Sequence, residues 1–233
     1  MSPRRRSPAL VWTLPRLLAL ALAAPAAATE PAAELAPDAG TEIASEPAPA
    51  DPAARAKAML ASDPQGAFAL YLEAAEQGNV AAQGMVGELY RAGVGVAADD
   101  DAAFRWLERA ALQGDRDAQA ALGSVYDEGR GIEADPAAAL AWFRKAAEAG
   151  HKGAQFNVGA MYMNGVGAPA DHAEAVMWLS LAADEVYSAR YLLYTREREI
   201  APEALTEGRR RAAARGAKLR PITPASSDRP DLR

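Results

Sequence analysis

Hydrophobic and small residues recur along this chain with a period of 36 positions, kept from residue 63 to residue 170. Within each period, apolar residues return every three or four positions over two stretches, which is the spacing of an amphipathic helix. In the third period the first stretch carries Leu140 and Phe143, and the second carries Phe156 and Tyr162. Two short helices cannot stand alone in water, so the pattern predicts helix pairs stacked on one another.

The most constant positions of the repeat are glycines and aromatic residues. A glycine inside a helix costs about 1 kcal/mol relative to alanine, so a glycine kept in the middle of each second helix predicts a crossing too close for a side chain. We interpret the recurring tryptophans as filling the core between helices, rather than as a site for a sugar or lipid. The repeat positions are Trp106, Trp142 and Trp178 in first helices, and Gly87, Gly123, Gly159, Tyr126 and Tyr162 in second helices.

Helix-start residues divide the chain into units. Asp63, Asp99, Asp135 and Asp171 stand 36 positions apart, and aspartate is a favoured N-cap residue. The fourth period loses its glycine turn, so its second helix is expected to be shortened. The expected divisions are a capping helix in residues 51–62, unit 1 in 63–98, unit 2 in 99–134, unit 3 in 135–170, a partial unit 4 in 171–199, a C-terminal capping helix in 200–219, and a disordered tail in 220–233.

The first 28 residues have the composition of a secretory signal peptide. Four arginines precede or flank a short apolar run at residues 17–24, and three alanines at residues 26–28 form a small-residue cleavage site. The run is too short to span a bilayer, although an uncleaved anchor is the alternative. Residues 29–50, rich in alanine, proline and glutamate, predict a disordered spacer. The expected location is the periplasm. Because the chain has no cysteine, it can form no disulfide bonds, and its fold must be held by packing alone.

Charge is unevenly distributed along the sequence. Residues 29–189 contain 10 basic and 25 acidic side chains, whereas residues 190–233 contain 11 basic and 6 acidic side chains. An acidic body argues against nucleic acid as a ligand, because phosphate binding needs a basic surface. The basic C-terminal region would suit an acidic partner or an anionic lipid surface, or it is simply a solvated last helix. Membrane contact is therefore expected only through this region or an uncleaved leader.

No constellation of catalytic or metal-binding residues is found in the sequence. His151 and His172 lie 21 positions apart and match no zinc-binding spacing. The glycine pairs after the second helices follow helices rather than strands, and they lack the lysine of a phosphate-binding loop. No serine has an acid and a base recurring beside it. We therefore expect a protein that is not an enzyme and uses no cofactor.

Function is expected where the units differ, on the outward side of the first helices. The candidate partner-binding residues are Arg105, Arg109, Arg144, Lys145 and Met177. The four cations would form a basic strip within an acidic body and bind an acidic segment. The alternative is ordinary pairing of charges on a solvated helix.

The recurring string A-x-x-W-x-x-K/R-A-A-x-x-G, followed by A-x-x-x-x-G-x-x-Y-x-x-G-x-G, resembles the Sel-1-like repeat, a relative of the tetratricopeptide repeat. The resemblance implies a right-handed superhelical solenoid of antiparallel helix pairs whose first helices line the concave side. It also implies a scaffold or regulator that binds partner proteins in the bacterial cell envelope, and we expect a monomer. Some exported relatives are credited with hydrolysing β-lactam-type substrates, so a hydrolase is one alternative, which the absence of cysteine disfavours. A peptidoglycan- or lipid-binding accessory is the other.

Overall fold

The computed structural model describes residues 51–219, and these contain ten α-helices, one short 3₁₀ helix and no strand. The all-α architecture predicted by the periodicity is therefore confirmed for this part of the chain. The expected leader, spacer and C-terminal tail, in residues 1–28, 29–50 and 220–233, lie outside the described residues.

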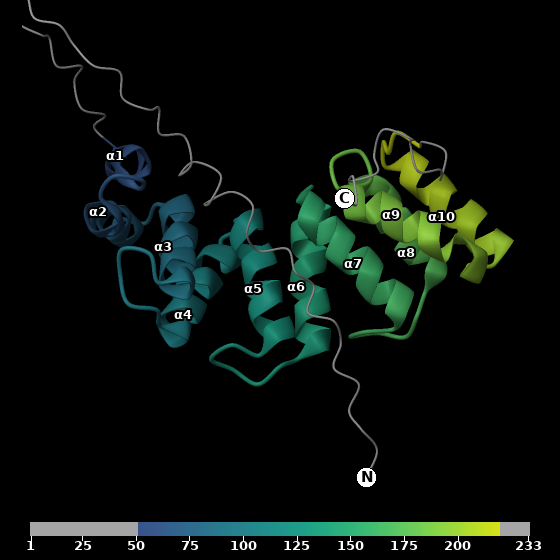
Figure 1. The fold of residues 1–233 in the computed structure, drawn as a ribbon, viewed down its shortest axis with the longest axis horizontal. Coiled ribbons are helices and arrows are strands. Elements are labelled where there is room, and N and C mark those ends of the chain that lie inside the picture. The colour runs from purple at the N-terminus through teal and green to yellow at the C-terminus, as the bar shows by residue number, and fades with distance from the viewer. Residues whose placement is uncertain (1–50, 220–233) are drawn as a thin grey trace, which may run out of the picture.

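The helices follow one another in an open arc, with α1 and α2 at one end and α8 to α10 at the other (Figure 1). Each unit contributes a first helix and a second helix of opposite direction, and a final helix follows unit 4. The helix α1 (Pro52–Met59) precedes unit 1, where the capping helix is expected. The helices that follow are α2 (Pro64–Glu76) and α3 (Val80–Ala92) in unit 1, α4 (Asp100–Leu112) and α5 (Arg116–Glu128) in unit 2, α6 (Pro136–Glu148) and α7 (Lys152–Asn164) in unit 3, α8 (His172–Ala182), α9 (Tyr187–Arg196) and η1 (Glu197–Glu199) in unit 4, and α10 (Pro202–Ala214).

Side-chain caps fix where each unit begins. The carboxylate of Asp99 accepts a hydrogen bond from the backbone amide of Ala102 at 2.8 Å. Asp63, Asp135 and Asp171 cap their helices in the same way. These bonds satisfy amide groups that the first turn of a helix leaves unpaired. The predicted starts of the first helices are therefore confirmed.

In units 1 to 3, the second helix packs against the first helix of the next unit at a glycine. A Cβ atom added to any of these glycines would overlap a large apolar side chain, so the structure shows the close crossing that the retained glycines predict. The added Cβ atom would lie 2.7 Å from Leu107 Cγ at Gly87, 2.7 Å from Phe143 Cδ1 at Gly123, and 2.6 Å from Leu179 Cγ at Gly159.

Unit 4 ends the solenoid differently. Its second helix α9 begins after Val186 with no side-chain cap. The next helix, α10, packs along α8 rather than continuing the stack over α9. A Cβ atom on Gly208 would lie 2.5 Å from the carbonyl oxygen of Ala173, so the two helices touch through their backbones. An ion pair of 2.8 Å between Arg211 and Glu174 joins α10 to α8.

Candidate partner-binding surface

Four cationic side chains lie exposed on the first helices of units 2 and 3. Arg105 and Arg109 come from α4, and Arg144 and Lys145 come from α6. These four residues are called the basic strip below. All of them had been proposed from the sequence, and the structure leaves each one accessible to a partner.

Aromatic rings hold two of these cations. The guanidinium carbon of Arg109 lies 5.6 Å from the centre of the Trp106 ring. The ammonium nitrogen of Lys145 lies 3.6 Å from the centre of the Trp142 ring. The negative face of an aromatic ring attracts a cation, and tryptophan does so most strongly. Each cation is therefore positioned without being neutralised.

Arg144 is held by polar groups. Its Nη1 donates to the Tyr162 hydroxyl at 3.3 Å. Its Nη2 lies 3.7 Å from Glu148 Oε1, one turn further along α6. Both groups are partly exposed, so this pairing is weak. Arg144 can exchange it for a carboxylate of a partner at little cost.

The tryptophan rings occupy two different environments. The sequence places all three in the core, and the structure buries only Trp178 fully, at 1% exposure. Trp106 and Trp142 are partly buried, each packed against the apolar cluster of the preceding unit. They fill the junction between units and also form the floor beneath the basic strip.

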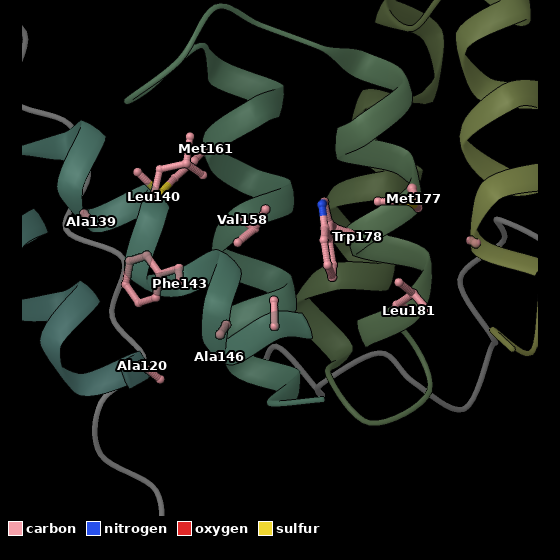
Figure 2. Close-up of a cluster of buried hydrophobic side chains, with 13 residues drawn as sticks. Ala120, Ala139, Leu140, Phe143, Ala146, Val158, Met161, Met177, Trp178 and Leu181 are labelled. Atoms are coloured by element: carbon pink, nitrogen blue, oxygen red, sulfur yellow. The ribbon is translucent and has the colours of Figure 1, made fainter. Parts of the chain in front are cut away.

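The prediction that Met177 lies on the binding surface is wrong. Its side chain is 2% exposed, and Leu181 on the next turn is 9% exposed. Figure 2 shows both with Trp178, in a cluster that also includes Ala212 of α10. Because α10 covers this side of α8, the slots that carry basic residues in unit 2 carry apolar ones here.

The repeated tyrosines support the loops that follow the second helices. The ring of Tyr126 meets that of Phe104 edge-on at 5.9 Å, within the same unit. The carbonyl oxygens of Tyr126 and Tyr162 accept hydrogen bonds from the amides of Asp135 and Asp171. These bonds connect the end of each glycine-rich loop, at the aspartate that caps the next first helix, to the second helix before the loop.

Sequence reasoning missed a buried glutamine in each second helix of units 1 to 3. Gln83, Gln119 and Gln155 donate to the carbonyl oxygens of Ala75, Ala111 and Ala147, at 3.1, 3.2 and 3.1 Å respectively. Each bond satisfies a carbonyl near the end of the first helix of the same unit. Their shared spacing of 36 residues is the pattern that could have revealed them.

Carboxyl groups with shifted pKa values do not form a catalytic pair. Burial raises the pKa of Asp127 on α5. Hydrogen bonds from Arg210 and Arg211 lower the pKa of Glu207 on α10 to about 2. The two groups lie in different parts of the solenoid, whereas acid–base catalysis needs both near one substrate.

His151 lies between α6 and α7, as the sequence predicts, and caps α7. Its Nδ1 accepts from the Ala154 amide at 2.9 Å, and its Nε2 lies 3.7 Å from Asp117 Oδ1. Within residues 51–219, no group of three acidic, histidine or cysteine side chains is placed to hold a metal ion. No helix in the same range is long and apolar enough to cross a membrane.

Comparison with known proteins identifies the repeat. The sequence model of the Sel1 repeat matches residues 58–79, 80–115, 116–151 and 153–186, which is more than half of the chain. The chain belongs to the Sel1 repeat family. The matched Sel1 units from residue 80 onward begin at second helices, so each pairs a second helix with the first helix that it crosses most closely.

Two solved structures resemble this Sel1 repeat chain. One is c5321, a protective antigen of uropathogenic Escherichia coli with an SLR fold, at 30% identity and a TM-score of 0.63 over 71% of this chain and 38% of c5321. Another is a Sel1 repeat protein from Oxalobacter formigenes, at 34% identity and a TM-score of 0.56 over 61% of this chain and 43% of the other. The chain thus spans less than half the length of either. No curated protein matches the sequence.

Proposed function

We propose that this Sel1 repeat protein is a non-enzymatic scaffold or regulator of the bacterial cell envelope, which binds an acidic segment of a partner protein along the basic strip. Proteins built from Sel1 repeats are typically scaffolds for protein–protein interaction. The export signature in residues 1–28 supports the envelope as its location.

The proposal rests on three cations of the basic strip that are exposed and form no ion pair. Arg105, Arg109 and Lys145 are exposed, and within residues 51–219 none of them forms an ion pair. Carboxylates of a partner would form charge-assisted hydrogen bonds with them, which are about twice as strong as neutral ones. The surrounding acidic body would repel an acidic partner elsewhere, so the strip also provides specificity.

The packing of the solenoid favours binding without rearrangement. The tryptophans beneath Arg109 and Lys145 are wedged against the preceding units, so the strip is supported by rings that cannot easily move. Binding to a preformed surface avoids the entropy cost of ordering loops and side chains. An extended acidic segment lying across α4 and α6 would contact both pairs of cations.

Crosslinking in the native envelope tests the proposal. The tagged wild-type chain is expected to retain a partner protein, and the double variant Arg105→Glu, Arg109→Glu is expected to retain at least about tenfold less. Added salt should weaken the wild-type complex, because exposed charges are screened.

Arg116→Glu is the matched control, because Arg116 is an exposed arginine on the second helix α5, outside the strip. It should retain the partner as the wild type does. Equal loss with Arg116→Glu and the double variant would show that only net charge matters and would refute the proposed site.

The two alternatives need separate measurements. Hydrolysis of a β-lactam by the purified chain would establish the enzyme alternative. For the lipid or cell-wall alternative, deletion of α10 is unsuitable, because it would uncover Met177 and Trp178. Neutralising Arg209 and Arg210, both on α10, tests it instead: loss of binding to anionic vesicles or peptidoglycan would support that reading.

A further inference from the structure

Residues 29–50, which precede the N-cap of α1, carry only one sign of charge. They contain five carboxylates and no arginine or lysine. Their only large aliphatic residues, Leu35 and Ile43, each directly follow a glutamate. This stretch therefore offers negative charge together with isolated apolar side chains. It is called the acidic segment below, and its carboxylates are Glu30, Glu34, Asp38, Glu42 and Glu46.

The basic strip has the charge that attracts such a segment. Among the first helices α2, α4, α6 and α8, only α4 and α6 contain arginine or lysine. From residue 105 to 112 and from residue 141 to 148, these two helices carry four cations against two carboxylates, Glu108 and Glu148. By contrast, α2 carries Glu73 and Glu76 without a cation, so it repels the segment.

The other carboxylates of α4 lie at the opposite end of the helix from Arg109. Asp100 and Asp101 are in its first turn, where they stabilise the positive end of the helix dipole. Asp100 is also paired with Arg130 at 2.9 Å. These two carboxylates therefore leave Arg109 available to a further carboxylate.

An exposed apolar side chain adjoins the strip. Leu112, at the end of α4, is 70% exposed. It follows Arg109 by three positions, so the two side chains lie on the same face of the helix. A glutamate bound to Arg109 and an aliphatic side chain on Leu112 match the order of Glu42 and Ile43 in the acidic segment.

The arginines of the last helix are less suitable for the segment. Arg210 and Arg211 of α10 both donate to Glu207, and Arg211 also binds Glu174 of α8. A segment that docked there would have to replace these carboxylates. Arg105, Arg109 and Lys145 form no ion pair within residues 51–219, so no such exchange is needed at the strip.

The acidic segment is long enough to follow the strip. Neighbouring helices pack about 8–10 Å apart, so three steps from α1 to α4 span at most about 30 Å and five steps to α6 at most about 50 Å. An extended chain covers about 3.3 Å per residue, which gives about 30 Å from Asp51 to Glu42 and about 56 Å from Asp51 to Glu34. Glu42 therefore reaches α4, and Glu34 reaches α6.

We propose that the acidic segment is an internal occupant of the basic strip, which a partner protein must displace in order to bind. Glu42 and Ile43 lie on Arg109 and Leu112 of α4, and Glu34 lies on Lys145 of α6. The inference rests on the proposed function, because the segment and the partner compete for the same cations. The segment thereby sets a threshold of affinity that only a partner with more carboxylates exceeds.

Tethering makes a weak contact sufficient. A segment joined to the solenoid by a short stretch of chain has an effective concentration on the order of millimolar. Exposed charge pairs with millimolar affinity are therefore populated within one chain. Because the contact lies within the chain, dilution should leave it unchanged, whereas added salt should weaken it.

Zero-length carbodiimide crosslinking of the full mature chain tests the contact directly. The reagent joins a carboxylate to a lysine amine that touches it, and the chain has four lysines, of which only Lys145 belongs to the strip. Peptide mapping should find the acidic segment joined to Lys145, at a yield independent of protein concentration. The variant Arg105→Glu, Arg109→Glu should lower this yield at least about threefold. Crosslinks confined to Lys57 of α1, or equal yields at Lys145 and the distant Lys218, overturn the proposal.

Binding of a fluorescein-labelled decaglutamate peptide, followed by anisotropy, tests the competition. The neutralised variant Glu34→Gln, Asp38→Asn, Glu42→Gln should bind the peptide about threefold more tightly than the wild type, which corresponds to a strip that is covered about two-thirds of the time. The matched control neutralises three exposed glutamates outside the segment, with Glu133→Gln, Glu185→Gln and Glu203→Gln, and should bind as the wild type does. Unchanged circular dichroism melting shows that each variant is folded.

The peptide measurement separates this inference from the proposed function. If the wild type and the neutralised variant bind equally well, and Arg105→Glu, Arg109→Glu weakens both, the strip binds carboxylates but the segment does not occupy it. That result overturns this inference alone. If the neutralised variant does not bind the peptide at all, the strip does not recognise carboxylates, and both are overturned.

Discussion

The repeated tryptophan has different surroundings in units 2 and 3 from those that it has in unit 4. In units 2 and 3 the ring is partly exposed and carries a cation from its own helix, Arg109 or Lys145. In unit 4 the equivalent of those cations is Leu181, and the cation over Trp178 is Arg215, which follows α10. The preference of the ring for a cation is thus met in every case, while the source of the cation changes.

The residue types beside the tryptophan distinguish a first-helix face that is exposed to solvent from one that another helix covers. Unit 2 places Arg105 and Arg109 beside its tryptophan, whereas unit 4 places Met177 and Leu181 in the same slots. Charged residues there remain solvated and available to a partner. Apolar residues there must be covered, and in this chain α10 covers them.

Removing the two kinds of tryptophan should give the largest contrast. Trp178→Ala leaves a cavity in a fully buried cluster and should lower the free energy of unfolding by about 3–5 kcal/mol. Trp142→Ala removes a partly buried ring and should cost about 1–2 kcal/mol. Urea denaturation followed by circular dichroism measures both. Equal losses of unfolding free energy would mean that Trp178, beneath α10, is no more deeply buried than Trp142 on the exposed face.

Two glycines of the same helix should respond in opposite directions. Gly87→Ala forces a Cβ atom to within 2.7 Å of Leu107 Cγ, so overpacking should outweigh the helix preference of alanine and destabilise by roughly 1–2 kcal/mol. Gly84→Ala meets only ordinary contacts, the nearest at 3.5 Å, and should stabilise by up to about 1 kcal/mol. Thermal melting of the two variants compares them directly. Stabilisation by both would refute the close crossing between units.

Acidification should slightly weaken the packing of α10 against α8 in unit 4. The pKa of Glu207 is lowered from 4.5 to about 2, so its ionised form stabilises the fold above pH 4.5 and this contribution is lost as the pH falls toward 2. Glu207 orients Arg211, which also binds Glu174 of α8. Melting of the wild type and of Glu207→Gln between pH 6 and pH 2 should show a difference that shrinks on acidification. A difference that grows instead would contradict the assigned partners.

The sequence predicted the interior units well because each one repeats the same environment. The aspartates that cap first helices, the crossing glycines and the starts of the helices all follow from the period. Partial exposure of Trp106 and Trp142 was missed, because the period shows that a position is constant but not how deeply its neighbours enclose it. The glutamine at Gln155 was overlooked, since a buried amide has no apolar spacing.

The end of the solenoid was harder to predict because no following copy defines its surroundings. The period indicated that α8 keeps the first-helix pattern, but it contained no information on where α10 would pack. Met177 was therefore placed on a surface that α10 covers. The small residues Gly208 and Ala212, four positions apart on α10, were the available indication of a close helix contact.

The contacts between neighbouring units are interchangeable, so the length of this solenoid can change by whole units. Each joint from unit 1 to unit 4 combines a glycine on one side with a leucine or phenylalanine on the other, at nearly equal separations. An in-frame duplication of residues 99–134 would therefore insert one more step, carrying its own pair of arginines, while leaving both ends unaltered. Gene duplication and deletion can tune the span of such a molecule without requiring a new core.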